Sequence, residues 1–222
     1  MTRPGRRDGF SADDFAAYER LTSLPLEDET EHESLVFEHA DVRGAKAEHV
    51  VLTDVQLQSV DAQGAALPRL AVRDALFADC DLSNARLLGA SLVWVDLRGC
   101  RATGLDVTES TLRHVTFHDC KIDLSLFRFT RTESVRFVDC ILTGADFSGA
   151  ALGGAVLEGC DLTGADLSFA NLEHADLRTT RLESLRGAGS LRGATIDPSQ
   201  LVTLAPALAS ELGIRVEGGD GG

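Results

Sequence analysis

Residues 165–179 read ADLSF ANLEH ADLRT, three consecutive copies of one five-residue pattern. In each copy an alanine comes two positions before a leucine. Stepping by five from Leu167 in both directions gives 30 positions between Phe37 and Leu182, and Thr132 alone among them is not apolar. A period of five residues therefore runs through about two thirds of the 222-residue chain.

A period of five fits neither of the two regular secondary structures. On an α-helix, apolar residues five apart would rotate by about 140° per step and spread around the whole surface. On a single β-strand they would alternate between opposite faces. The pattern instead predicts a chain that turns a corner every five residues and points one large and one small side chain inward on each side.

All five cysteines follow a coarser spacing of twenty residues, at Cys80, Cys100, Cys120, Cys140 and Cys160. Twenty residues make four sides of five, so residues twenty apart should stack about 4.8 Å apart, as in parallel strands. Stacked side chains point in parallel and do not converge as a disulfide requires, and no C-x₂-C pair indicates a zinc site. We interpret the cysteines as a ladder of small core residues.

The tandem A-[DN]-L-x-x pattern, with its C-x-[LFI]-x-x variants, resembles the pentapeptide-repeat family over residues 35–184. The resemblance implies an all-β solenoid, a right-handed quadrilateral β-helix of short strands joined by tight turns. Thirty repeats would form about 7.5 coils and a rod roughly 36 Å long at about 4.8 Å per coil. Because one repeat is too small to bury its own apolar face, stability should come from the stacking of neighbours.

Residues 1–34 precede the repeats and are expected to form an N-terminal extension and cap. Ser11, with Asp14 three residues later, predicts the start of a short amphipathic helix that runs to Leu21. The acidic run at residues 27–33 is interpreted as a solvated linker.

Residues 185–222 are expected to form a C-terminal cap with a helix over about 198–212 and a disordered tail. Asp197 and Gln200 are spaced as in a capping box, and Pro206 should kink or split the helix. Two interpretations stay open: the apolar residues cover the last coil, or they also join two rods as a homodimer, as the gyrase-directed Qnr and MfpA branch of the family implies. The candidate dimer residues are Leu201, Leu204, Leu208, Leu212, Ile214 and Val216, of which the last two alternate with polar residues as in a short strand.

Nothing in the sequence indicates catalysis. The six histidines are scattered, and no glycine-rich phosphate loop is present. The chain is predicted not to be an enzyme and to hold no cofactor or metal. No apolar run reaches the roughly 20 residues of a membrane span, and the N-terminus does not resemble a secretory signal. We therefore expect a cytoplasmic protein with reduced thiols and no membrane partner.

The net negative charge of the chain limits the kinds of partner that it can bind. The chain has a net charge of −14, and residues 35–184 hold 22 acidic and 14 basic side chains. Direct nucleic-acid binding is disfavoured, because it requires a basic surface. The acidic rod is consistent with simple solubility or with imitation of DNA in a basic groove. The candidate DNA-mimic positions are Asp41, Asp61, Asp81 and Asp161 on the side that holds the cysteines, and Asp146 and Asp166 on another.

Several large apolar residues occupy positions that should face outward on two adjoining sides. A contiguous group of this kind marks a partner surface. The stretch 128–133, the weakest part of the repeat, is interpreted as a bulged coil or a contact site. The candidate partner surface comprises Leu88, Val93, Trp94, Leu126, Phe129 and Phe169.

Two functions are compatible with these features. The first, implied by the resemblance, is binding to DNA gyrase or topoisomerase IV as a DNA mimic that protects the enzyme from quinolone-type inhibitors or toxins. The second is a general protein-interaction scaffold with an unidentified partner. The unbroken register and the N-terminal extension depart from the gyrase-protecting members and put protection through projecting loops in doubt.

Overall fold

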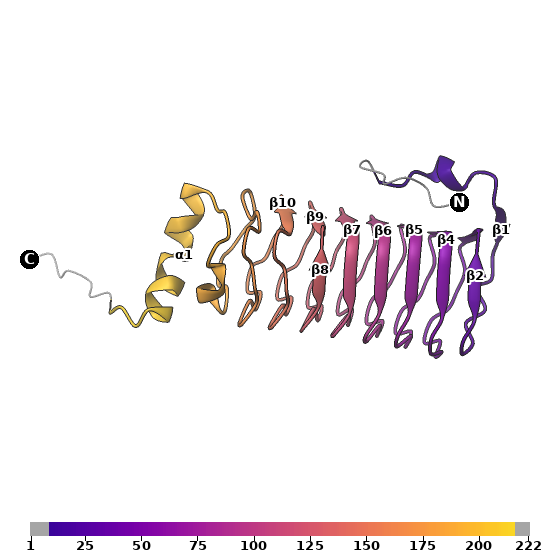
Figure 1. The fold of residues 1–222 in the computed structure, drawn as a ribbon, viewed down its shortest axis with the longest axis horizontal. Coiled ribbons are helices and arrows are strands. Elements are labelled where there is room, and N and C mark those ends of the chain that lie inside the picture. The colour runs from indigo at the N-terminus through magenta and orange to yellow at the C-terminus, as the bar shows by residue number, and fades with distance from the viewer. Residues whose placement is uncertain (1–8, 216–222) are drawn as a thin grey trace, which may run out of the picture.

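Every fifth residue from Glu29 to Ser184 has a positive backbone φ, between 51° and 70°. A left-handed residue at this interval turns the chain through one corner after each pentapeptide. Four such sides close one coil, and the structure is a parallel β-solenoid of about seven turns (Figure 1). It is a computed structural model that describes residues 9–215. The predicted solenoid is confirmed.

The strands pair in parallel along the rod. From β3 onward they pair at an offset of twenty residues, so that Phe77 lies beside Leu57 and Leu97. The longest strands each continue around one corner, and those beyond β7 are shorter. Their bounds are β1 (Glu19–Leu21), β2 (Glu31–Glu33), β3 (Leu35–Glu38), β4 (Val51–Gln58), β5 (Ala71–Ala78), β6 (Ser91–Arg98), β7 (Thr111–His118), β8 (Arg131–Glu133), β9 (Arg136–Val138) and β10 (Val156–Glu158).

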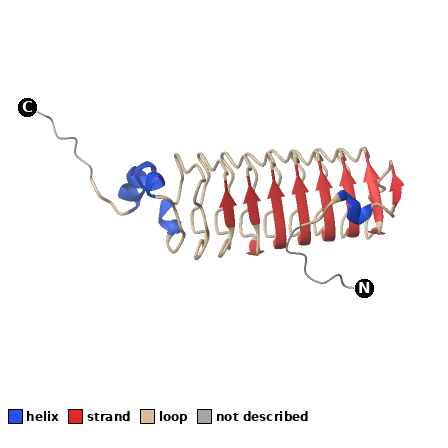
Figure 2. Cartoon of the chain, turned by 90° about the horizontal axis from the view of Figure 1, so that it is seen from above, coloured by secondary structure: helices blue, strands red, loops and turns tan. Residues whose placement is uncertain are grey.

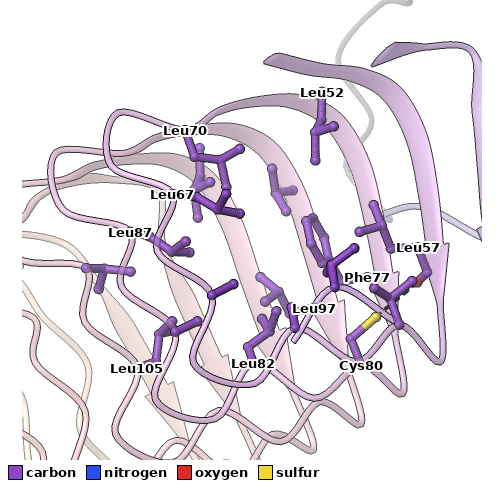
Figure 3. Close-up of a pocket in the computed structure, with 18 of the residues that line it drawn as sticks. Leu52, Leu57, Leu67, Leu70, Phe77, Cys80, Leu82, Leu87, Leu97 and Leu105 are labelled. Carbon is purple, nitrogen blue, oxygen red and sulfur yellow. Dashed lines mark hydrogen bonds between the residues drawn. The ribbon is translucent and has the colours of Figure 1, made fainter. Parts of the chain in front are cut away.

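The core consists of the large and small residues that the repeat points inward. Phe117 stacks on Phe137 with ring centroids 4.8 Å apart, which is the spacing of adjacent coils. The N-terminal half is filled mainly by leucine, valine and alanine, and these enclose with Phe77 a narrow apolar cavity of about 50 Å³ (Figure 3). The five cysteines are buried and free, as expected for a core ladder. Each thiol lies 3.4–3.6 Å from the carbonyl oxygen of a residue in the preceding coil.

The N-terminal segment differs from the expected helix and linker. Only a single 3₁₀ turn, η1 (Ala12–Phe15), follows Ser11, and the chain then enters strand β1, which pairs with β3. Strand pairing with the first coil outweighs the weak helical pattern. The acidic run is also not a simple linker, because its last three residues form β2 beside β4. Leu24 is buried, and together with Leu26 it closes the N-terminal end of the apolar core.

The C-terminal end is covered by η2 (Ala188–Leu191) and α1 (Pro198–Glu211), as Figure 1 shows. The predicted capping box is present at Asp197 and Gln200. Pro206 does not split the helix. The carbonyl that loses its donor belongs to Val202, a solvent-exposed residue, so water can replace the missing hydrogen bond. No helix within residues 9–215 is long and apolar enough to span a membrane.

Candidate interaction surfaces

The six aspartates predicted to imitate phosphates all hold the turns of the repeat. In each, Oδ1 accepts the backbone N–H of the residue two positions later, at 2.9–3.1 Å. This contact is an Asx turn, which fixes the backbone ahead of the corner. The donor–acceptor pairs are Arg43–Asp41, Gln63–Asp61, Ser83–Asp81, Ser148–Asp146, Thr163–Asp161 and Ser168–Asp166.

The same carboxylates are also paired with arginines. Arg186 lies 3.0 Å from Asp166, and Arg128 lies 2.6 Å from Asp146. On the side that holds the cysteines, the outward row begins with three aspartates but continues with cations and an isoleucine. That row is Asp41, Asp61, Asp81, Arg101, Lys121, Ile141, Asp161 and Arg181. The predicted ladders are therefore interrupted and largely neutralised.

These contacts lower the pKa values of several of the carboxyl groups. The hydrogen bond from Arg43 is the main cause that brings the pKa of Asp41 to about 2. For Asp81 and Asp166, partial burial acts in the opposite direction, but the hydrogen bonds from Ser83 and Ser168 and the neighbouring arginines prevail and lower the pKa. These three carboxylates therefore stay ionised under all ordinary conditions.

A second set of aspartates was not singled out from the sequence. Asp79, Asp119 and Asp139 occupy the same corner of the coils, with positive φ values of 53°, 51° and 51°. All three are exposed. Asp79 accepts a hydrogen bond from Gln58 at 3.0 Å, and Asp119 lies 3.0 Å from His118. We call these three residues the acidic corner.

The predicted partner surface divides into two groups. Leu88, Phe129 and Phe169 are exposed, and Phe169 keeps 92% of its surface accessible. Phe129 and Phe169 share one corner two coils apart, and a Cβ on the intervening Gly149 would lie 2.5 Å from the Phe129 ring. The Phe129 ring therefore occupies the space that a side chain at position 149 would need.

The other three predicted surface residues, Val93, Trp94 and Leu126, are half-buried. The indole of Trp94 stacks on His114 with centroids 3.9 Å apart. Trp94 also packs against the cluster that Phe10 and Phe15 of the N-terminal segment form with Val36 and Leu76. It is therefore not freely exposed as expected, because the chain covers it with its own N-terminal residues.

The candidate dimer residues divide in a similar way. Leu204 is buried and Leu208 packs against the core, so both serve to cover the last coil. Leu201, Leu212 and Ile214 remain exposed on the outer side. Ile214 is not in a strand, and Val216 lies outside the described residues.

Within residues 9–215, no three histidine, cysteine, aspartate or glutamate side chains are grouped so that they could hold a metal ion.

Comparison with known families gives two matches along the rod. A model described as a pentapeptide repeat region matches residues 50–127, and a model of eight pentapeptide repeats matches residues 140–178. The chain belongs to the pentapeptide-repeat family. Together the two matches cover more than half of it.

A curated relative is the quinolone resistance pentapeptide repeat protein QnrB96 of Scandinavium goeteborgense. It is 35% identical over 88 residues, which are 39% of this chain and 38% of the relative. The aligned part of this chain thus spans well under half of that relative's length.

Solved structures of similar proteins include two of the same family. Full-length QnrB1, a plasmid-mediated fluoroquinolone resistance protein, is 23% identical over 89% of this chain and 100% of its own, with a TM-score of 0.42. HetL, involved in heterocyst differentiation regulation in the cyanobacterium Nostoc, is 22% identical over 76% of this chain and 94% of its own, with a TM-score of 0.42.

Proposed function

We propose that this chain is a non-enzymatic rod that binds DNA gyrase or topoisomerase IV on the surface that normally receives DNA. Bound there, it would protect the enzyme from quinolone-type inhibitors or from a toxin that acts at the same place. The observation that carries the proposal is the 35% identity over 88 residues with a protein named for quinolone resistance. Such a role would place the protein in the cytoplasm.

The charge on the rod supports the proposal, although through different residues from those predicted. The turn-forming aspartates are paired with arginines. The acidic corner is exposed and lies along the axis of the rod, with Asp119 and Asp139 one coil apart, or about 4.8 Å. We assign to it the contact with the basic residues of a DNA-binding groove.

We further propose that two rods associate through the outer side of α1. Leu201, Leu212 and Ile214 are more than half exposed. Exposed apolar residues on and just after a terminal helix favour pairing with a second copy. The dimer would be about twice as long as one rod.

A second candidate function is a scaffold that presents Phe129 and Phe169 to another kind of partner. Both aromatic rings occupy left-handed corner positions, which bulky residues rarely adopt. Ten of the corner positions between Gly44 and Gly164 are glycine, so the aromatic residues are costly exceptions. A role in binding would explain why such residues stand there.

Supercoiling by purified gyrase, titrated with this protein with and without a fluoroquinolone, tests the proposal. We expect inhibition or drug protection at micromolar protein. The double variant Asp119→Asn/Asp139→Asn should lose at least tenfold in potency, whereas Glu109→Gln, a neutralised carboxylate at another corner, should not. No effect of the wild-type protein at any concentration would favour the scaffold, with Phe129 and Phe169 as its contact site.

A further inference from the structure

Residues 9–18 lie along the outside of the rod, and we call them the strap. In Figures 1 and 2 the strap runs back from the first coil over the neighbouring strands. Phe15 is completely buried and Phe10 is 7% exposed, although neither belongs to the interior of the solenoid. The two rings lie 5.8 Å apart and pack against Val36 and Leu76. The strap is thus a docked segment.

The strap is fixed at its start by a specific polar contact. The backbone N–H of Phe10 donates to Asp96 Oδ2 at 2.7 Å. The side chain of Asp96 is only 9% exposed, and it also accepts a hydrogen bond from Arg98 at 3.0 Å. A Cβ on Gly9 would lie 2.5 Å from the same Asp96 oxygen. The site therefore accepts glycine followed by an aromatic residue and leaves no room for a side chain at the first position.

The strap also has a defined far end. The hydroxyl of Tyr18 donates to Asp54, and the Tyr18 ring meets Phe15 edge to face at 5.8 Å. In the described part of the chain, strand pairing begins only at β1, after Tyr18. The strap is therefore held by side chains and by hydrogen bonds to carboxylates, and its release would leave the ladders between the coils intact.

The surface under the strap differs from its continuation along the rod. Outward positions beneath the strap include apolar Val36, Leu76 and Trp94, with the buried Gln56 between the first two. The equivalent outward positions further along are Thr116 and Arg136, and these line an open groove with Arg98 and His118. An apolar stretch with a buried acceptor thus leads into a polar stretch, in which Arg98 is paired with Asp96 and Arg136 with Glu158.

We propose that this surface is a peptide-binding groove, which the strap occupies within its own chain and which a partner protein occupies by displacing the strap. The partner segment has a glycine followed by an aromatic residue, with a second aromatic residue five positions after the first. The inference does not depend on a topoisomerase partner.

The test uses the full-length chain and a fluorescently labelled peptide with the sequence of residues 8–18. The receptor is the double variant Phe10→Ala/Phe15→Ala, whose own strap lacks both anchors. We expect saturable binding with a Kd in the micromolar range and a change in the emission of Trp94, the only tryptophan in the chain. Wild-type protein should bind at least tenfold more weakly, because its strap fills the groove.

Matched variants distinguish specific docking of the peptide from nonspecific hydrophobic binding. A peptide with both phenylalanines replaced by alanine should lose binding, whereas Asp13→Ala, a change at an exposed strap position, should not. Asp96→Asn in the receptor should weaken binding at least tenfold. If the double variant does not fold, Gly9→Val in the full chain unlatches the strap and keeps both rings. Absence of binding to a folded unlatched variant, or equal binding to wild type, would overturn the proposal.

Discussion

Most aspartates of the rod occupy one of two positions in the five-residue repeat, and the two positions have different consequences. Before a large core residue, as at Asp166, the carboxylate caps a turn and pairs with an arginine. At the corner, as at Asp119, the carboxylate is exposed and lies 3.0 Å from the ring of the neighbouring His118. Only the second kind remains available to a partner, so a count of acidic residues overstates the charge that the rod presents.

The turn aspartates should make stability depend on pH. The pKa values of Asp81, Asp146 and Asp166 are lowered in the folded chain. A lowered pKa stabilises the folded state above the unfolded value of about 3.9, and this effect is lost as pH falls through the folded value. We expect the melting temperature to be constant above about pH 5 and to fall between about pH 4 and 2.

The triple variant Asp81→Asn/Asp146→Asn/Asp166→Asn is the control for this pH effect. Its melting temperature at neutral pH should be lower, and its decline between about pH 4 and 2 should be shallower. Circular dichroism melts at a series of pH values measure both. Parallel declines in the variant and the wild type would show that these carboxylates do not carry the acid sensitivity.

The inward register predicts very unequal effects of core substitutions. Phe137 is fully buried between Phe117 and the neighbouring aromatic rings. Phe137→Asp should cost more than about 4 kcal/mol and abolish folding, since it leaves an unpaired charge in the core. Cys120→Ala removes only the sulfur atom and should cost about 1 kcal/mol. Chemical denaturation followed by circular dichroism compares the two; a Phe137→Asp variant as stable as wild type would contradict the register.

Phe169 should lower the stability of the rod. Its φ is 61°, a conformation that costs a bulky residue about 1–2 kcal/mol, and its ring is almost fully exposed. Phe169→Asn places a residue that accepts this conformation, so we expect the melting temperature to rise by about 2–4 °C. Differential scanning calorimetry measures the shift. A clear fall in melting temperature would show that the ring stabilises the fold.

The residue pattern predicted the inward-facing side chains but not the environment of the outward-facing ones. The five-residue period predicted which side chains point inward, and Phe137, Leu167 and the cysteines lie as expected. It did not predict which outward residues are exposed and unpaired, because their environment depends on neighbours twenty residues away. The acidic corner was visible in the stretches LFADC, TFHDC and RFVDC, where an aspartate precedes each cysteine. The structure of the corner was needed to show that this aspartate is exposed.

At the scale of elements, α1 has a covering side and an exposed side. Leu204 is 1% exposed and closes the last coil, whereas Leu212 is 74% exposed. Leu204→Asp should destabilise the rod by about 3 kcal/mol, because the charge would face the core. Leu212→Asp should leave the melting temperature unchanged and weaken only self-association. Thermal melts with light scattering distinguish the two; equal destabilisation would contradict the cap.

The N-terminal element shows where sequence reasoning failed. Ser11 and Asp14 form the predicted contact at 2.9 Å, yet the helix stops after one turn. Phe15 and Tyr18 satisfied a helical spacing, but they pack outside the rod against distant repeats. A helical pattern this short is easily overridden by tertiary contacts, and none of those contacts is visible in the local sequence. The C-terminal helix was predictable because its capping signals are local.

At the scale of the whole molecule, the rod presents surfaces that differ around its circumference. The strap covers part of one side, the acidic corner adjoins that side, and Phe129 and Phe169 stand at another corner. A partner that approaches the rod from one direction contacts either the strap side with its acidic corner or the corner that holds Phe129 and Phe169. The unbroken register keeps each surface straight along the axis, which suits a partner that normally holds a straight duplex.

The most direct measurement is displacement of fluorescently labelled duplex DNA from purified gyrase by this protein, followed by anisotropy. The account predicts complete, saturable displacement at micromolar protein, weakened at least tenfold in Asp119→Asn/Asp139→Asn and unchanged in Glu109→Gln. Displacement should also weaken as salt is raised, because the contact is between opposite charges. A gyrase–DNA complex that is unaffected by excess protein, or that binds the protein and DNA together, would contradict the account.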